Sequence, residues 1–155
     1  MTYISKYNSP LGKITLASDG DNLIGLWFDK QKYYLGNIKE YGEKQLTIFE
    51  DTSKWLDSYF KGEKPLINIR VKFNGTRFRC KVWNELLKIE YGKLTTYGQI
   101  AKKLKTSPRA VGNAVGHNPI SIVVPCHRVI GKDGSLTGYA GGINIKSKLL
   151  ELEKN

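Results

Sequence analysis

The chain has 155 residues, of which 40% are hydrophobic and 11% aromatic, so it can bury a real core, which argues against a disordered chain. Its formal net charge is +11, which suits a polyanionic partner such as nucleic acid, although lysine-rich surfaces also arise from genome composition. The two cysteines lie far apart, the N-terminus lacks a signal-peptide pattern, and no apolar run approaches about 20 residues. These features predict a soluble protein of the cytoplasm with no membrane partner.

Residues 2–29 predict a three-stranded antiparallel meander. Apolar residues alternate with others along residues 14–16 and 24–28, as they do in half-buried strands. Two clusters of turn-forming residues, 8–12 and 19–22, separate the strands.

The next predicted element is a helix of about four turns. Apolar residues recur at helical spacing from Leu46 to Phe60, and Gly62 follows as a stop signal. Residues 65–73 are expected to be extended. Residues 1–74 carry no recognisable chemistry, and we interpret them as a scaffold lobe.

A second lobe begins at residue 75, where Thr76 is a plausible helix N-cap. An apolar stripe from Phe78 to Ile89 predicts a helix that ends at Gly92. Cys80 lies off this stripe inside the helix. It is either a small semi-buried side chain or a second reactive thiol or metal ligand.

Two short helices then predict a helix-turn-helix within a strongly basic region, residues 70–109. The first covers residues 96–104, and the second starts at Pro108 after a capping Ser107. The second helix offers small residues where a reader of base sequence needs long polar ones. Its smooth surface allows either close approach to a narrow DNA groove or tight packing between helices.

The most informative stretch is residues 125–129, Pro-Cys-His-Arg-Val, which follows the apolar run 120–124. The run predicts a strand that shelters the sulfur. A thiol is nucleophilic as the thiolate, and His127 and Arg128 supply proton-accepting and cationic neighbours. A Cys–His pair alone is also found in proteases and redox proteins.

Several segments together resemble the methylated-DNA–protein-cysteine methyltransferases, which repair O6-alkylguanine in DNA. The matching segments are Leu94-Thr-Thr-Tyr-Gly-Gln-Ile-Ala101, Arg109-Ala-Val-Gly-Asn-Ala-Val-Gly-His-Asn-Pro119, Pro125-Cys-His-Arg-Val-Ile-Gly131 and Gly138-Tyr-Ala-Gly-Gly142. The resemblance implies an α+β fold. It would have a ribonuclease H-like scaffold lobe in residues 1–74 and a winged-helix-like DNA-binding and alkyl-transfer lobe in residues 75–155.

The resemblance also implies a suicide reaction in which the sulfur of Cys126 attacks the alkyl carbon and keeps the alkyl group. In this family a water-bridged relay activates the thiol, with His127 as its base and Glu153 orienting the imidazole ring. The alternative carboxylate for this role is Glu151. Tyr97 would assist the leaving guanine. The implied catalytic residues are Cys126, His127, Glu153, Tyr97 and Asn118.

The family flips the damaged nucleotide out of the duplex from the minor groove. Arg109 would take the vacated space in the base stack, and Asn118 would tie the second helix to the strand that bears the cysteine. The implied DNA contacts are Arg109, Ala110, Gly112, Asn113, Ala114, Thr96, Tyr97 and Arg128. The implied substrate pocket consists of Tyr97, Val124, Pro125, Tyr139, Ala140 and Gly141.

The expected partner is therefore double-stranded DNA that contains O6-alkylguanine or, less favourably, O4-alkylthymine, bound by a monomer without a cofactor. No metal site is expected, because the N-terminal lobe has neither cysteine nor histidine.

Three other functions compete with this one. Alkyltransferase-like sensors lack the cysteine that stands here at position 126. A cysteine hydrolase needs an oxyanion hole and usually a distant histidine, whereas His127 is adjacent and His117 lies in the DNA-binding part. A transcriptional regulator should carry base-reading side chains on its second helix.

Overall fold

The computed structural model describes residues 1–29, 31–136, 139 and 142–154. The chain divides into two compact units. The first unit contains Met1–Asn74 and Pro119–Val123, and the second contains Gly75–Asn118 and Val124–Asn155. Within the described part of the chain, no helix is long and apolar enough to cross a membrane.

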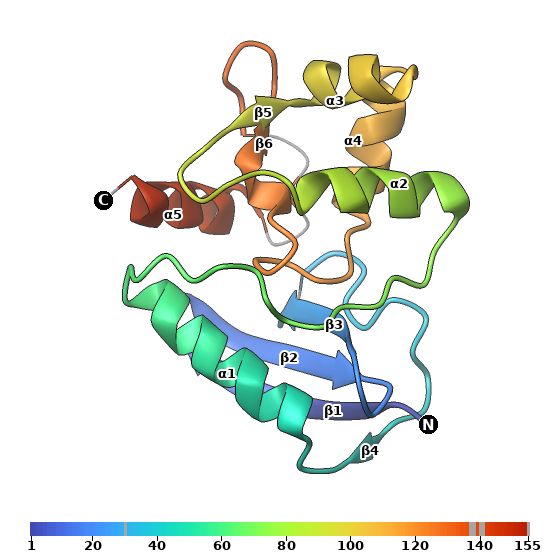
Figure 1. The fold of residues 1–155 in the computed structure, drawn as a ribbon, viewed down its shortest axis with the longest axis vertical. Helices are drawn as coiled ribbons and strands as arrows, with labels where there is room; N and C mark the ends of the chain where they lie inside the picture. Colours follow the sequence, from blue (N-terminus) through green and yellow to red (C-terminus); the bar gives the residue numbers. More distant parts are fainter. Residues whose placement is uncertain (30, 137–138, 140–141, 155) are drawn as a thin grey trace. The chain divides into compact units, whose positions relative to one another are not determined.

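The first unit is built on a sheet with the strand order β3-β2-β1-β4 (Figure 1). The strands β1 (Tyr3–Ser9), β2 (Gly12–Ser18) and β3 (Leu23–Phe28) form the predicted antiparallel meander. A two-residue strand that the sequence analysis missed, β4 (Gly42–Glu43), pairs in parallel with β1.

Helix α1 (Thr47–Phe60) packs against the sheet, in agreement with the prediction (Figure 1). Leu46 is its N-cap residue and Lys61 its C-cap residue. Its apolar spacing puts one face into the core of the unit, where Leu56 and Tyr59 are fully buried together with Ile14 and Leu16 of β2. The residues of α1 that are buried are Ile48, Phe49, Thr52, Trp55, Leu56 and Tyr59.

The predicted strand 120–124 is wrong. Ile120 forms a single parallel bridge with Leu26 of β3, and the Ser121 N–H donates to the Leu26 carbonyl at 3.0 Å. The pairing ends there, because the Val123 N–H turns back to the Ser121 carbonyl at 2.8 Å and Ile122 takes a φ of 69°. Apolar composition predicted the burial of this run correctly, but not its tight turn.

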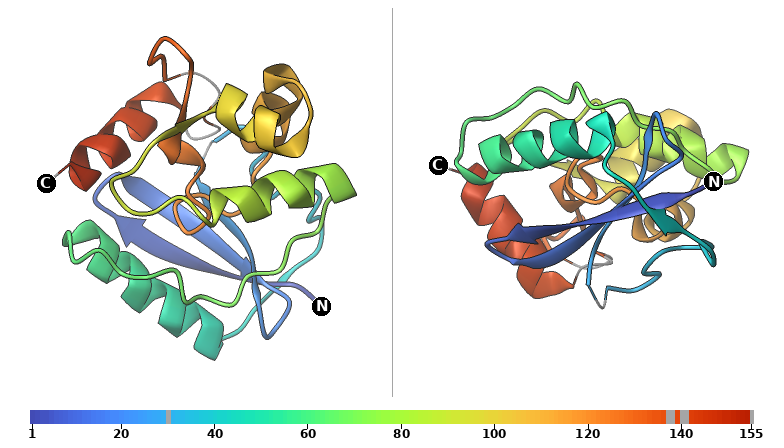
Figure 2. Two further views of the ribbon diagram at one scale, coloured as in Figure 1. Left: turned by 45° about the horizontal axis from the view of Figure 1, so that its top comes forward. Right: turned by 90° about the horizontal axis from the view of Figure 1, so that it is seen from below.

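The second unit contains the predicted helix-turn-helix. Helix α2 (Arg77–Leu86) starts at Thr76, whose side chain accepts from the Arg79 N–H, and it ends earlier than the apolar stripe suggested. Helices α3 (Tyr97–Leu104) and α4 (Pro108–Gly116) follow (Figure 2). Thr96 and Gln99 form a capping box at the start of α3, and Ser107 caps α4.

The remaining elements surround the cysteine. A 3-10 helix, η1 (Cys126–Arg128), leads into β6 (Val129–Ile130), which pairs in parallel with β5 (Thr95–Thr96). Helix α5 (Ile143–Glu153) packs against η1. With these two units the predicted α+β class is confirmed.

Candidate active site

Cys126 opens η1 in a buried position, with 3% of its surface exposed. Its N–H donates to the Val124 carbonyl at 2.8 Å, so the backbone is tightly turned around Pro125. Burial raises the pKa of the Cys126 thiol to about 11, while a hydrogen bond from Asn118 and the charge of Lys146 act in the opposite direction. At neutral pH the sulfur of the free protein is therefore a thiol, and it must lose its proton to react.

His127 follows the cysteine, and its ring is fully buried against Glu153. The Nε2 atom of His127 lies 2.5 Å from Oε2 of Glu153. Burial lowers the pKa of His127 below its ordinary value, despite the opposing effect of Glu153. A neutral ring that donates from Nε2 to a carboxylate leaves Nδ1 as its basic nitrogen. The pair can accept a proton at Nδ1, and Glu153 stabilises the imidazolium that results.

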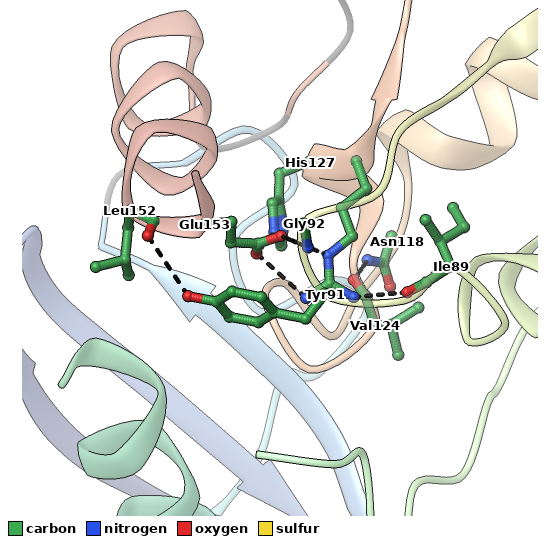
Figure 3. Close-up of polar contacts among 9 residues, drawn as sticks. Ile89, Tyr91, Gly92, Asn118, Val124, His127, Leu152 and Glu153 are labelled. Atoms are coloured by element: carbon green, nitrogen blue, oxygen red, sulfur yellow. Dashed lines mark hydrogen bonds and ion pairs between the residues drawn. The ribbon is translucent and has the colours of Figure 1, made fainter. Parts of the chain in front are cut away.

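The carboxylate of Glu153 is held by further donors (Figure 3). Arg128 donates from Nε to Oε1 at 2.8 Å and from Nη2 to Oε2 at 3.2 Å. The Gly92 N–H donates to Oε1 at 3.2 Å. Arg128 also donates to the Ile89 carbonyl at 2.6 Å and lies 5.6 Å from the ring centroid of Tyr91. Donors on several sides favour the ionised carboxylate and fix its orientation.

Asn118 joins the end of α4 to the residues that precede the cysteine. Its N–H donates to the Val115 carbonyl at 3.1 Å, and its Nδ2 donates to the Val124 carbonyl at 2.9 Å (Figure 3). The side chain is buried, with 3% exposed. A displacement of α4 would therefore be transmitted directly to the backbone beside Cys126.

Two tyrosines belong to the predicted pocket. Tyr97 is the first residue of α3 and is half-buried; burial, and to a lesser extent Cys126, raises its pKa to about 12. Tyr139 is buried. The other predicted pocket residues on that loop, Ala140 and Gly141, lie outside the described residues.

The helix-turn-helix presents a mixture of small and cationic residues. Arg109 and Asn113 are exposed on α4, and Gly112 is partly exposed. A Cβ atom at Gly112 would come no closer than 3.8 Å to the ring of Tyr97. The turn before α4 contains Lys105 in the left-handed conformation, with a φ of 58°.

Family models match both parts of the chain. The ribonuclease-like domain of 6-O-methylguanine DNA methyltransferase matches residues 2–73, and the DNA binding domain of the same family matches residues 77–155.

The chain belongs to the 6-O-methylguanine DNA methyltransferase family.

Individual relatives are similar over nearly the whole chain. The methylated-DNA–protein-cysteine methyltransferase of Haemophilus influenzae is 42% identical over 98% of this chain and 86% of its own. The enzyme of that name from Methanosarcina acetivorans is 43% identical over 97% of both chains. The crystal structure of Mycobacterium tuberculosis OGT in complex with DNA matches with a TM-score of 0.89 and 42% identity, over 98% of this chain and 92% of that one.

Within this methyltransferase fold, the structure brings four of the predicted catalytic residues together. Cys126, His127 and Glu153 lie in the contiguous arrangement described above, and Asn118 is bonded next to them. Glu151, the alternative to Glu153, has a side chain that is 72% exposed and forms an ion pair with Lys154 at 3.7 Å. Across the part of the chain that the structure describes, no group of three or more His, Cys, Asp or Glu side chains is placed to hold a metal ion.

Two predicted DNA contacts are contradicted. Arg128 is 3% exposed, and its guanidinium is bonded to Glu153 and the Ile89 carbonyl, so it faces the interior. The cation whose charge lowers the pKa of the Cys126 thiol is Lys146. Ala114 is 1% exposed and lies on the core side of α4, where its carbonyl accepts from Trp83 Nε1 at 2.8 Å. The small residue at 114 therefore serves helix packing, the alternative that the sequence left open.

One charged residue of the site was missed altogether. Lys146 on α5 is fully buried, and it shares the inner face of the helix with Leu149 and Glu153. The sequence carried a signal: these positions are spaced by three and four residues, so a lysine there falls on the apolar stripe. A lysine on such a stripe is buried only with a compensating partner, and that pattern marks it as a candidate functional residue.

Proposed function

We propose that this protein repairs DNA by transferring the alkyl group of O6-alkylguanine in a duplex irreversibly to its own Cys126. The observation that carries the proposal is the sulfur of a buried cysteine beside a His127–Glu153 pair, in the part of the chain that matches a DNA-binding domain. The relatives named above are methyltransferases of this kind, and one of them was crystallised with DNA.

The proposed reaction moves one alkyl group and one proton. His127 takes the thiol proton of Cys126 through a bridging water, and the resulting thiolate attacks the alkyl carbon in line with the bond to O6. The S–C bond forms as the O–C bond breaks, and its electrons pass to the guanine. Tyr97 hydrogen-bonds to the guanine ring or passes it a proton, and the proton removed from the thiol reaches the leaving guanine anion through solvent. The net result is a thioether at Cys126 and an unmodified guanine.

The target atom is inside a duplex, so the nucleotide must first be turned out of the stack. In the proposal, Arg109 enters the vacated space and α4 lies in the minor groove, with Ala110, Gly112 and Asn113 close to the DNA backbone. Thr96 and Tyr97 at the start of α3 complete this surface. The pocket for the base is formed by Val124, Pro125 and Tyr139, with Ala140 and Gly141.

The proposed protein acts once. A thioether sulfur has no proton to lose and the S–C bond has no good leaving group, so neither water nor His127 can regenerate the cysteine. The substrate range would include O4-alkylthymine less favourably. We propose further that the protein acts as a monomer in the cytoplasm.

The test is mass spectrometry of the intact protein after incubation with a duplex that contains O6-methylguanine. We expect a single added methyl group on the peptide with Cys126, and product that levels off at one group per protein whatever the excess of DNA. Cys126→Ser should bind the duplex without accepting a methyl group. Cys80→Ser, the matched control, should react like the wild type. Labelling of Cys80, or turnover well beyond one, would overturn the proposal.

A further inference from the structure

Lys146 is a buried cation whose charge acts on the reactive sulfur. Its side chain projects from α5 into the interior of the second unit, and none of its surface is exposed. The ammonium donates a hydrogen bond to the Val129 carbonyl at 2.5 Å. It also lies 5.8 Å from the centroid of the Tyr97 ring. These contacts place the charge between the strand that follows η1 and the start of α3.

The ionisable groups near this ammonium come from three elements. Tyr97 faces it from α3, and Cys126 and His127 interact with it electrostatically from η1. The other charged residues of η1 and α5 in this region, Arg128 and Glu153, are bonded to each other. The carboxylate of Glu153 is paired with the guanidinium of Arg128, and the charge of Lys146 favours the ionised form of Cys126.

Burial of an ammonium opposes folding, because the charge loses its hydration. Burial lowers the pKa of Lys146 to about 8, against the opposing effect of Cys126. The hydrogen bond to the Val129 carbonyl does not by itself require a lysine, since an apolar side chain of similar length fills the same space without a charge to desolvate. A residue that is costly for stability and lies beside a nucleophile is a candidate for a role in the reaction.

We infer that Lys146 is a positioning residue whose buried positive charge stabilises the thiolate of Cys126. It acts through the sulfur. The inference rests on the proposed function, because it explains how a thiol buried in an apolar setting becomes anionic when an alkylated base is bound. It also divides the work of the site: His127 removes the proton, and Lys146 compensates the negative charge that remains.

The inference predicts a characteristic pH profile. The lowered pKa of His127 means that the thiol proton it accepts passes on to solvent before the attack. Lys146 loses its proton near pH 8 and the thiol nearer pH 11, so between these values the two groups share one proton. The fraction that carries both the ammonium and the thiolate is then constant. The rate of alkyl transfer should therefore rise up to about pH 8 and level off above it. Without the ammonium, the rate should continue to rise towards the pKa of the thiol.

Three variants test this. Lys146→Met removes the charge with little change of volume, Lys146→Arg keeps it, and Lys148→Met removes an exposed charge from the same helix as a matched control. The Cys126 pKa is measured by NMR of protein labelled with 13C at cysteine Cβ, where Cys80→Ser assigns the two signals. Methyl transfer from duplex DNA is measured in single turnover across the pH range, and stability by the midpoint of urea unfolding.

For Lys146→Met we expect a higher Cys126 pKa, at least tenfold slower transfer at pH 7, loss of the plateau above pH 8, and an unfolding midpoint that is unchanged or raised. Lys146→Arg should recover part of the rate, and Lys148→Met should match the wild type. An unchanged Cys126 pKa in Lys146→Met, or slower transfer that merely follows a lower unfolding midpoint, would overturn the inference.

Two further outcomes are informative. If Lys146→Met does not fold, the pH dependence of the wild-type transfer rate still tests the inference. A rate that continues to rise tenfold per pH unit above pH 8 would contradict it. If the wild type transfers no methyl group but Lys146→Met raises the Cys126 pKa, the proposed function fails while the electrostatic role stands.

Discussion

Arg128 and Arg109 show how differently the two halves of the proposed site are built. Arg128 follows the reactive cysteine and is 3% exposed, with its guanidinium bonded to Glu153 and to a backbone carbonyl. Arg109 stands in the first turn of α4 and is exposed to solvent. The region around η1 and the end of α5 is a buried polar network, whereas the surface of α3 and α4 is open and basic.

This difference suggests that the buried network supports alkyl transfer and that the exposed surface supports DNA binding. A buried network keeps its groups in one geometry because each charge would be unstable without its partner. An exposed arginine is free to change its conformation when DNA arrives, and it contributes little to the fold. Removing one partner of the buried Arg128–Glu153 pair should therefore lower stability and slow the chemistry together, and removing an exposed charge from α3 or α4 should change only the response to DNA.

The largest effect is expected from Arg128→Met. Removing the guanidinium leaves the buried carboxylate of Glu153 without its main partner, which should lower the free energy of unfolding by about 3–5 kcal/mol. Denaturant unfolding measures this, with Arg109→Met as the matched control that should change stability by less than about 0.5 kcal/mol. The dependence of DNA affinity on salt should be unchanged in Arg128→Met, since a buried guanidinium releases no counterions. A shallower salt dependence would restore Arg128 as a phosphate contact.

A second effect should appear as a loss of stability in acid. The folded protein holds His127 neutral because burial lowers its pKa, while in the unfolded chain the imidazole titrates near its ordinary value of 6.5. As the pH falls below that value, the unfolded state binds a proton that the folded state does not, so folding weakens. We expect a loss of at most about 1 kcal/mol between pH 6.5 and 5.5 from this residue.

The measurement is urea unfolding at both pH values in the wild type, His127→Gln and His117→Gln. The loss should be reduced in His127→Gln and retained in His117→Gln, which removes the less buried histidine. An equal loss in all three proteins would assign the pH dependence to other groups.

A third effect concerns the exposed surface alone. Arg109→Ala should slow methyl transfer from duplex DNA at least tenfold, because turning a nucleotide out of the stack costs a few kcal/mol and the arginine occupies the space it leaves. Transfer from the free base O6-methylguanine requires no flipping and should proceed at the wild-type rate. Single-turnover kinetics on both substrates distinguish the two. Equal losses would mean that Arg109 supports the fold or the pocket.

Most helices and strands could be predicted from the sequence because capping residues and apolar periodicity indicate the same elements. Thr76 and Ser107 were each placed correctly as helix caps, since a side-chain oxygen before an apolar periodic segment satisfies a free N–H whatever the rest of the chain does. Thr96 was assigned to the helix itself, whereas it is the N-cap of α3. Strand β4 was missed because two residues carry no periodicity. The run 120–124 was assigned to a strand because composition alone does not reveal the turn at Ile122.

The surroundings of the cysteine were only partly predictable. Resemblance to a family nominated His127 and Glu153, which lie far apart in the sequence and meet in the structure. The side chain of Arg128 points inward because it binds Glu153 of α5, a helix that is distant in the sequence. A basic residue beside a cysteine suggested a lower thiol pKa, but burial dominates and the nearby cation is Lys146, which comes from a different element. Charged residues that are far apart in the sequence meet only after folding, so their pairing could not be predicted from local sequence patterns.

The smallest effect tests the smooth surface of α4. Gly112 lies inside the helix, and an added Cβ would meet the Tyr97 ring at an ordinary contact distance of 3.8 Å. Alanine is a better helix former, so Gly112→Ala should raise the free energy of unfolding by about 0.5–1 kcal/mol. If α4 approaches DNA closely through its backbone, the same methyl group should weaken duplex binding a few-fold, and Gly112→Leu should weaken it further. Fluorescence anisotropy with an unmodified duplex measures the DNA affinity of both variants. Greater stability with undiminished binding would show that DNA does not contact this position, and that the glycine serves only the packing of α4 against Tyr97.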